Sequence, residues 1–115
     1  MNQSGCEFCN LVSNLSSVRQ KLKIVYETDN VLAFHSLRPI SEVHIIVISK
    51  RHISSILELN EADNELSLDI MSAMKIAAKE VISLKGACKV IMHLGSFQEA
   101  KHLHYHVVYD SKNNP

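Results

Sequence analysis

Three histidines near the C-terminal end of the chain alternate with other residues in the segment His102-Leu103-His104-Tyr105-His106-Val107-Val108. Side chains of a strand alternate between its two faces, so this spacing predicts that the three imidazoles share one face. The intervening side chains are then expected to enter the core. A lone surface histidine needs no function, but three at a period of two on an apolar strand indicate a shared site.

Two chemistries compete for this face of histidines. His102 and His106 would lie roughly 13 Å apart along an extended strand. A zinc–nitrogen bond is only about 2.1 Å long, so three ligands on one straight strand converge poorly on a single ion. A neutral imidazole, with a pKa near 6.5, can instead attack phosphorus as a covalent nucleophile at pH 7. His104 is the best placed for that role because it has a histidine on each side.

A second group of reactive side chains is the cysteine pair in Cys6-Glu7-Phe8-Cys9. Two thiolates supply half of a tetrahedral zinc site. The natural candidates for the other ligands are His52, in Lys50-Arg51-His52-Ile53, and one histidine of the triad. Two alternatives remain, a redox pair and two free thiols. A thioredoxin-type redox pair would follow a strand in a βαβ unit, and no strand is predicted before Cys6.

The elements that must position these residues follow from hydrophobic periodicity. Apolar segments at residues 22–26, 31–35, 43–49, 88–94 and 103–109 predict five strands, the first two forming a hairpin. Segment 43–49 is apolar nearly throughout, which predicts a central strand covered on both faces. His44 lies within it and must be hydrogen-bonded, either as a core histidine or as a donor to the triad's pocket. A long helix is predicted at about 61–85, after an N-cap at Asn60 and before Gly86. This order indicates an α+β fold with an antiparallel sheet.

Composition excludes several classes of function. The chain has 115 residues, a length typical of one domain. Basic and acidic residues number 12 each, and this zero net charge argues against a nucleic-acid binder and a polybasic membrane-surface protein. No apolar run approaches the ~20 residues of a membrane span, and the N-terminus lacks the pattern of a secretory signal. We therefore expect a cytoplasmic protein that binds neither nucleic acid nor membrane.

Together these residues resemble the histidine triad (HIT) family of nucleotide hydrolases and transferases, whose motif is His-φ-His-φ-His-φ-φ with φ apolar. Residues 102–108 match this motif. The cysteine pair and segments 24–34 and 44–53 are similar to those of the bacterial zinc-containing branch, so the resemblance covers about residues 5–109. It implies one HIT domain over residues 1–115, a five-stranded antiparallel sheet with one long helix and a short N-terminal helix or turn, and a homodimer.

The resemblance also implies a role for each matching residue. His104 would be the nucleophile. The phosphate would contact His44, His106 and Gln98, the nucleoside would contact Phe34, Ser36 and Leu37, and a structural zinc ion would be held by Cys6, Cys9, His52 and His102, with no organic cofactor. The implied reaction is hydrolysis at the α-phosphorus of purine nucleoside 5′-phosphoramidates, which are conjugates of AMP or GMP, through a nucleotidyl-histidine. The alternatives are a dinucleoside polyphosphate hydrolase and a nucleotide-binding or sensing module with little catalysis.

Four positions depart from the family pattern. Ser36 stands where the family commonly has an aspartate for the ribose hydroxyls. Glu99 stands where a serine commonly follows the glutamine, and a carboxylate there would repel an anionic phosphate unless it turns outward or is protonated. Val43 and Ser49 replace a usual glycine and proline. These departures concern substrate preference and rate, and they leave the nucleophile unchanged.

Overall fold

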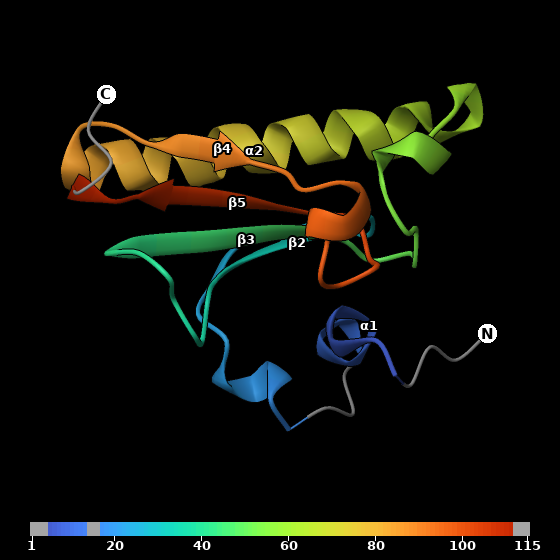
Figure 1. The fold of residues 1–115 in the computed structure, drawn as a ribbon, viewed down its shortest axis with the longest axis horizontal. Coiled ribbons are helices and arrows are strands. Elements are labelled where there is room, and N and C mark those ends of the chain that lie inside the picture. The colour runs from blue at the N-terminus through green and yellow to red at the C-terminus, as the bar shows by residue number, and fades with distance from the viewer. Residues whose placement is uncertain (1–4, 14–16, 112–115) are drawn as a thin grey trace.

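The computed structural model of the chain describes residues 5–13 and 17–111. Its five strands form one antiparallel sheet in the order β1-β2-β3-β5-β4 (Figure 1). Their bounds are Ile24–Glu27 for β1, Val31–His35 for β2, Val43–Ser49 for β3, Lys89–Ile91 for β4 and His104–Tyr109 for β5. The predicted α+β fold with a five-stranded antiparallel sheet is confirmed.

Helix α2, Asn64–Lys85, packs along one face of the sheet (Figure 1). Its buried residues recur every three or four positions, the period of a helix with one apolar stripe: Leu66, Ile70, Ala73, Ala77 and Val81. The helix ends at Gly86, whose φ of 85° is one that glycine adopts at low cost. No helix of the described segments is long and apolar enough to cross a membrane.

The predicted start of the long helix differs in form from the observed one. Residues Glu61–Asp63 form a separate 3₁₀ turn, η3, and the regular helix begins at the next residue, Asn64. The reason is a capping box: the Asn60 side chain accepts from the Ala62 amide at 2.9 Å, and the Asp63 carboxylate accepts from the Asn60 amide at 3.1 Å. The helix predicted at 61–85 is therefore correct apart from its first turn.

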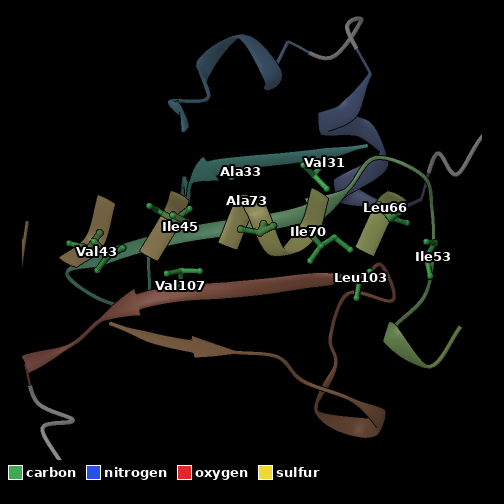
Figure 2. Packing of buried hydrophobic residues seen from close by; sticks show 13 residues of the cluster. Val31, Ala33, Val43, Ile45, Ile53, Leu66, Ile70, Ala73, Leu103 and Val107 are labelled. Atoms are coloured by element: carbon green, nitrogen blue, oxygen red, sulfur yellow. The ribbon is translucent and has the colours of Figure 1, made fainter. Parts of the chain in front are cut away.

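Strand β3 lies at the centre of the sheet, and all seven of its residues are buried. Its alternate side chains pack into two clusters on opposite faces. Ile45 and Val47 join the cluster under α2, together with Val107 of β5 (Figure 2). Ile46 and Ile48 face the other way and pack with Phe8 of the N-terminal helix α1, Glu7–Val12. The prediction of a central strand covered on both faces is confirmed.

The register of β3 with β5 determines which face the histidines occupy. His104 pairs with Ile48 and His106 pairs with Ile46, so both imidazoles belong to the face that carries α1. His102 precedes the strand, because the Leu103 amide donates to the Ile53 carbonyl at 2.6 Å instead of joining the ladder. The strand predicted at 22–26 is observed at 24–27, and the one predicted at 88–94 is observed at 89–91. The strand predicted at 103–109 begins one residue later, at His104.

Candidate active site and metal centre

A cavity of about 1470 Å³ opens on the face of the sheet that carries α1. Its floor includes His44 of β3 together with His104 and His106 of β5. Its walls come from α1, from the loop that follows β2 and from the loop between β4 and β5, which contains the 3₁₀ turn η4, Gly95–Phe97. Three segments that are distant in sequence therefore surround the two C-terminal histidines of the triad.

His104 is held in one tautomer by a backbone carbonyl. Its Nδ1 lies 2.6 Å from the carbonyl oxygen of His102, and since a carbonyl only accepts, Nδ1 carries the proton. The other nitrogen, Nε2, then has a free lone pair. Burial lowers the pKa of His104 below its usual value, which keeps the ring neutral at pH 7. The Phe8 ring, 4.9 Å away between centroids, packs against the imidazole. A neutral, oriented imidazole at a cavity is suited to nucleophilic attack.

His44 and His106 form a hydrogen-bonded chain whose direction can be assigned. The Ile40 amide donates to Nδ1 of His44 at 3.2 Å, so the proton of His44 resides on Nε2. That Nε2 lies 2.8 Å from Nδ1 of His106 and donates to it. His106 is thereby left with its own proton on Nε2, as a donor. Burial and the neighbouring His104, His44 and His93 lower the pKa of His106 to about 4, so it is neutral at pH 7.

Two cysteines and two histidines converge beside this cavity. The ligand atoms of Cys6, Cys9, His52 and His102 all lie within 4.8 Å of one another. Nδ1 of His102 is 3.2 Å from Sγ of Cys6, and Nδ1 of His52 is 3.2 Å from Sγ of Cys9. Nε2 of His102 donates to the Ser49 carbonyl at 2.7 Å, which leaves Nδ1 with the lone pair that a metal needs.

The chemistry of this donor set fits a tetrahedral zinc ion. Two thiolates and two neutral imidazoles are a common structural zinc set, and four protein ligands leave no open position. Burial and the adjacent Cys6 raise the pKa of the Cys9 thiol to about 11, so binding of a cation would have to displace a proton there. His104 does not belong to the cluster.

His102 links the cluster to the histidine face. Its side chain is one of the four converging potential ligands, and its backbone carbonyl accepts a hydrogen bond from Nδ1 of His104. A metal ion that holds the imidazole of His102 would also hold the peptide that orients His104. The three histidines of the motif therefore occupy three different environments. His102 belongs to the cluster of four potential metal ligands, His104 lines the cavity outside that cluster, and His106 is hydrogen-bonded to His44.

The residues expected to bind a nucleoside lie along one wall. Phe34, in β2, lines the cavity and is almost fully buried. Leu37 is half exposed at the rim. Ser36 also lines the cavity, and its hydroxyl accepts from the Arg38 amide at 3.1 Å, which stabilises the turn that follows β2.

The contact between Gln98 and phosphate stays a prediction, and in the structure the Gln98 amide has protein partners. The side chain is buried beneath the loop and is absent from the described lining of the cavity. Its Nε2 donates to the carbonyls of Ser54 and Ala100 at 2.5 and 3.0 Å. Both amide protons are thus used to brace the loop, and the remaining amide oxygen is an acceptor, which a phosphate does not favour.

Several functional groups were missed by the sequence reasoning. Phe8 packs against both His102 and His104, and its position between the two cysteines was the only available signal. The carbonyls of Ser49 and His102 assign two tautomers, but backbone atoms carry no sequence signal. Arg38 lines the cavity and pairs with Glu7 of α1 at 2.5 Å between Nη2 and Oε2.

Comparisons with known proteins agree with this architecture. The family described as "Scavenger mRNA decapping enzyme C-term binding" matches residues 5–115. An uncharacterised HIT-like protein of Borreliella burgdorferi is 34% identical over 113 residues, which cover 95% of this chain and 78% of that protein. The bifunctional adenosine 5′-phosphosulfate phosphorylase/adenylylsulfatase of Arabidopsis thaliana is 29% identical over 110 residues, which cover 92% of this chain and 70% of that protein.

Solved structures show the same fold. A histidine triad protein from Clostridium difficile superimposes with a TM-score of 0.76 at 31% identity, over 100% of this chain and 98% of that one. A HIT family hydrolase from Clostridium thermocellum gives a TM-score of 0.76 at 27% identity, over 99% of this chain and 97% of that one. The α+β arrangement described above is therefore that of these proteins.

Proposed function

Because the chain belongs to the histidine triad (HIT) family, we propose that it is a nucleotide hydrolase that acts at the α-phosphorus of nucleoside 5′-phosphoramidates. The observation that carries this proposal is the state of His104. It is neutral, its Nδ1 proton is held by the His102 carbonyl, and it lines the large cavity outside the metal cluster.

The reaction takes place in two displacements at phosphorus. Nε2 of His104 attacks the α-phosphorus, the phosphorus–nitrogen bond of the substrate breaks, and its electron pair leaves with the amine, which takes up a proton. Water then attacks the phosphorus of the nucleotidyl-histidine and gives up a proton, which balances the one that the amine takes up. The bond from phosphorus to Nε2 breaks, its electron pair returns to His104, and a nucleoside monophosphate is released. The proton on Nε2 of His106 is available for a hydrogen bond to a phosphoryl oxygen as charge develops there.

The relay from the Ile40 amide through His44 to His106 supports this assignment. A histidine that must donate to phosphate needs a proton on the correct nitrogen, and the relay supplies it without any positive charge. Gln98 is not included among the phosphate contacts that we propose, because its amide protons serve the loop. We propose that the nucleoside, a purine, lies along Phe34, Ser36 and Leu37, which line the same cavity.

We propose that Cys6, Cys9, His52 and His102 hold a structural zinc ion. When bound, zinc would supply rigidity rather than Lewis-acid chemistry, because four protein ligands saturate a tetrahedral ion. The residue that benefits is His104, whose orientation depends on the peptide of His102.

A second candidate is hydrolysis of a nucleotide whose leaving group is an anion. The A. thaliana relative is named for adenosine 5′-phosphosulfate, and the same nucleophile would serve such substrates. A binding module with little catalysis remains the third alternative, because Glu99 lines the cavity. One experiment separates the three: turnover of adenosine 5′-phosphoramidate, diadenosine tetraphosphate and adenosine 5′-phosphosulfate, with zinc measured in the same sample. Release of AMP from the phosphoramidate supports the proposal, whereas tight nucleotide binding without product over hours supports the binding module.

We also propose that the protein is a homodimer and that it is cytoplasmic. The dimer is supported by exposed apolar side chains on α2 and on the edge strand β4. They are Leu68, Met71, Ile82 and Leu84 on α2 and Val90 on β4. Met74, by contrast, packs partly against the core. Light scattering after gel filtration would measure the mass in solution, and a monomer at micromolar concentration would contradict the first point.

A further inference from the structure

Two opposite charges on the loop between β4 and β5 line the cavity without pairing with each other. Within residues 5–13 and 17–111, neither Glu99 nor Lys101 takes part in an ion pair. Nζ of Lys101 donates to the Gly95 carbonyl at 2.9 Å, a contact that leaves its positive charge unbalanced. The other two permanent charges of the described lining, Glu7 and Arg38, neutralise each other.

The position of this loop determines which part of a bound substrate would lie near Glu99. The loop after β2, which contains Ser36 and Leu37, and the 3₁₀ turn η4 lie toward opposite ends of the sheet (Figure 1). The histidines on β5 belong to the same cavity as both loops. If the nucleoside lies at the first loop and the phosphorus atom at His104, the second loop is the part of the cavity wall that remains for the rest of the substrate.

Phe97, in η4, gives this end of the cavity a second feature. The residue is 77% exposed, and both it and Glu99 line the cavity. An exposed aromatic face next to an unpaired carboxylate is an arrangement that attracts organic cations, through the ring quadrupole and through direct charge. The same carboxylate repels sulfate and polyphosphate groups.

We propose that Glu99 selects nucleotide conjugates whose leaving group carries an organic ammonium, while Lys101 balances the negative charge of the phosphoryl group. This inference rests on the proposed function, and it specifies the leaving group that the site prefers. The ammonium meant here is a second amine on the leaving group, not the nitrogen bonded to phosphorus. An anionic leaving group, such as sulfate, would be disfavoured at the same place.

The test is a series of three adenosine 5′-phosphoramidates of equal length. The leaving amines are 1,4-diaminobutane, butylamine and 4-aminobutyrate, which are cationic, neutral and anionic at their free ends. kcat/KM is measured for the wild type, Glu99→Gln, Glu99→Asp and Lys101→Gln. Glu61→Gln, on η3 and outside the described cavity lining, is the control for loss of one negative charge.

An exposed charge pair changes an equilibrium by up to about five-fold, so attraction of the cation and repulsion of the anion together change the ratio by up to about 25-fold, and about ten-fold is the expected size. We expect Glu99→Gln to lower the wild-type ratio of cationic to anionic kcat/KM by about that factor. Glu99→Asp and Glu61→Gln should keep the ratio, and 0.5 M salt should reduce it. Lys101→Gln should raise KM for all three substrates alike, because it acts on the phosphoryl group that they share.

The outcomes distinguish this inference from the proposed function. A ratio that is unchanged in Glu99→Gln, with turnover intact, overturns the role of Glu99 and leaves the hydrolase proposal in place. A ratio that falls equally in Glu61→Gln also overturns it, because the effect would then be general. A wild type that hydrolyses none of the three substrates overturns the proposed function, and this inference with it.

Discussion

Acid should destabilise the fold through the pair of hydrogen-bonded histidines, His44 and His106. Burial holds the pKa of both rings below the ordinary value, and that of His106 falls to about 4. In the unfolded chain a histidine titrates near 6.5. Between those two values the unfolded state binds a proton that the folded state does not. The contribution of His106 to the free energy of unfolding is therefore fully present above about pH 6.5, and it is lost as the pH falls toward 4.

The magnitude follows from the two pKa values. Linkage between about 4 and 6.5 gives a loss of about 2 kcal/mol at pH 5 for His106. The ring is only partly buried, so solvent screening reduces the expected loss to about 1 kcal/mol. The charged and titratable neighbours that face it are His44, His93 and His104, and all three disfavour its protonated form.

Urea unfolding of the zinc-loaded protein at pH 8, 6.5 and 5 would measure this loss. Far-UV circular dichroism is the suitable signal, because the chain has no tryptophan. The variant His106→Asn is the comparison, since its side-chain oxygen can still accept from Nε2 of His44 but cannot titrate. Any contribution of the metal cluster is common to both proteins and cancels in the difference. The wild type should lose about 1 kcal/mol more than the variant between pH 8 and pH 5. Equal losses, or a His106 pKa of 6.5 measured by NMR, would refute the reasoning.

Three further predictions concern the site. His104→Asn should lower turnover of the phosphoramidate by about a thousand-fold or more and abolish a nucleotide adduct detected by mass spectrometry, since the nucleophile is gone; normal turnover would contradict the role assigned to His104. Cys9→Ser should reduce the zinc content and lower both the unfolding free energy and kcat, because the peptide of His102 that orients His104 loses its anchor; zinc analysis with steady-state kinetics checks this, and an unchanged kcat in zinc-free protein would count against it. Gln98→Ala should lower the unfolding free energy by about 1–3 kcal/mol through two unpaired carbonyls. The KM of the Gln98→Ala variant should change little if the loop stays folded. A large rise in KM with unchanged stability would instead support a contact between Gln98 and phosphate.

Most of the fold could be predicted from local pattern. Strands β2 and β3 begin and end where their apolar segments do. Both are inner strands with a neighbouring strand on each side, so their apolar residues are buried along the whole length of the strand. The C-terminal end of α2 follows from Gly86, a residue that tolerates the left-handed conformation. The ends of β1 and β4 and the start of β5 could not be predicted in this way. Those of β4 and β5 depend on the pairing of β4 with β5 and on the amide of Leu103, which bonds to Ile53.

The residue types of the site could be predicted from the sequence, but the tautomers and hydrogen-bond partners of its side chains could not. The period-two spacing required that His104 and His106 share a face, and the cysteine spacing required a partner pair for any metal. The choice of His102 as the partner of the cysteines was an expectation from the resemblance. In the structure, hydrogen bonds of residues 102 and 103 to Ser49 and Ile53 bring His102 next to His52 and the two cysteines. The hydrogen bonds of the Gln98 amide likewise depend on a carbonyl of a distant segment, Ser54, and on one of its own loop, Ala100.

The sequence by itself determined the order of the elements and which side chains share a face, because those follow from periodicities of two and of 3.6 residues along a local stretch of chain. Tertiary structure alone decided the protonation of each imidazole. The carbonyls of His102 and Ser49 and the amide of Ile40 assign the protons of His104, His102 and His44. The Ser49 carbonyl is 53 residues from His102 in sequence, whereas the other two backbone groups lie two and four residues from the histidines they contact and are oriented by the irregular backbone that precedes each strand. Burial, which keeps these rings neutral, is likewise a property of the folded chain.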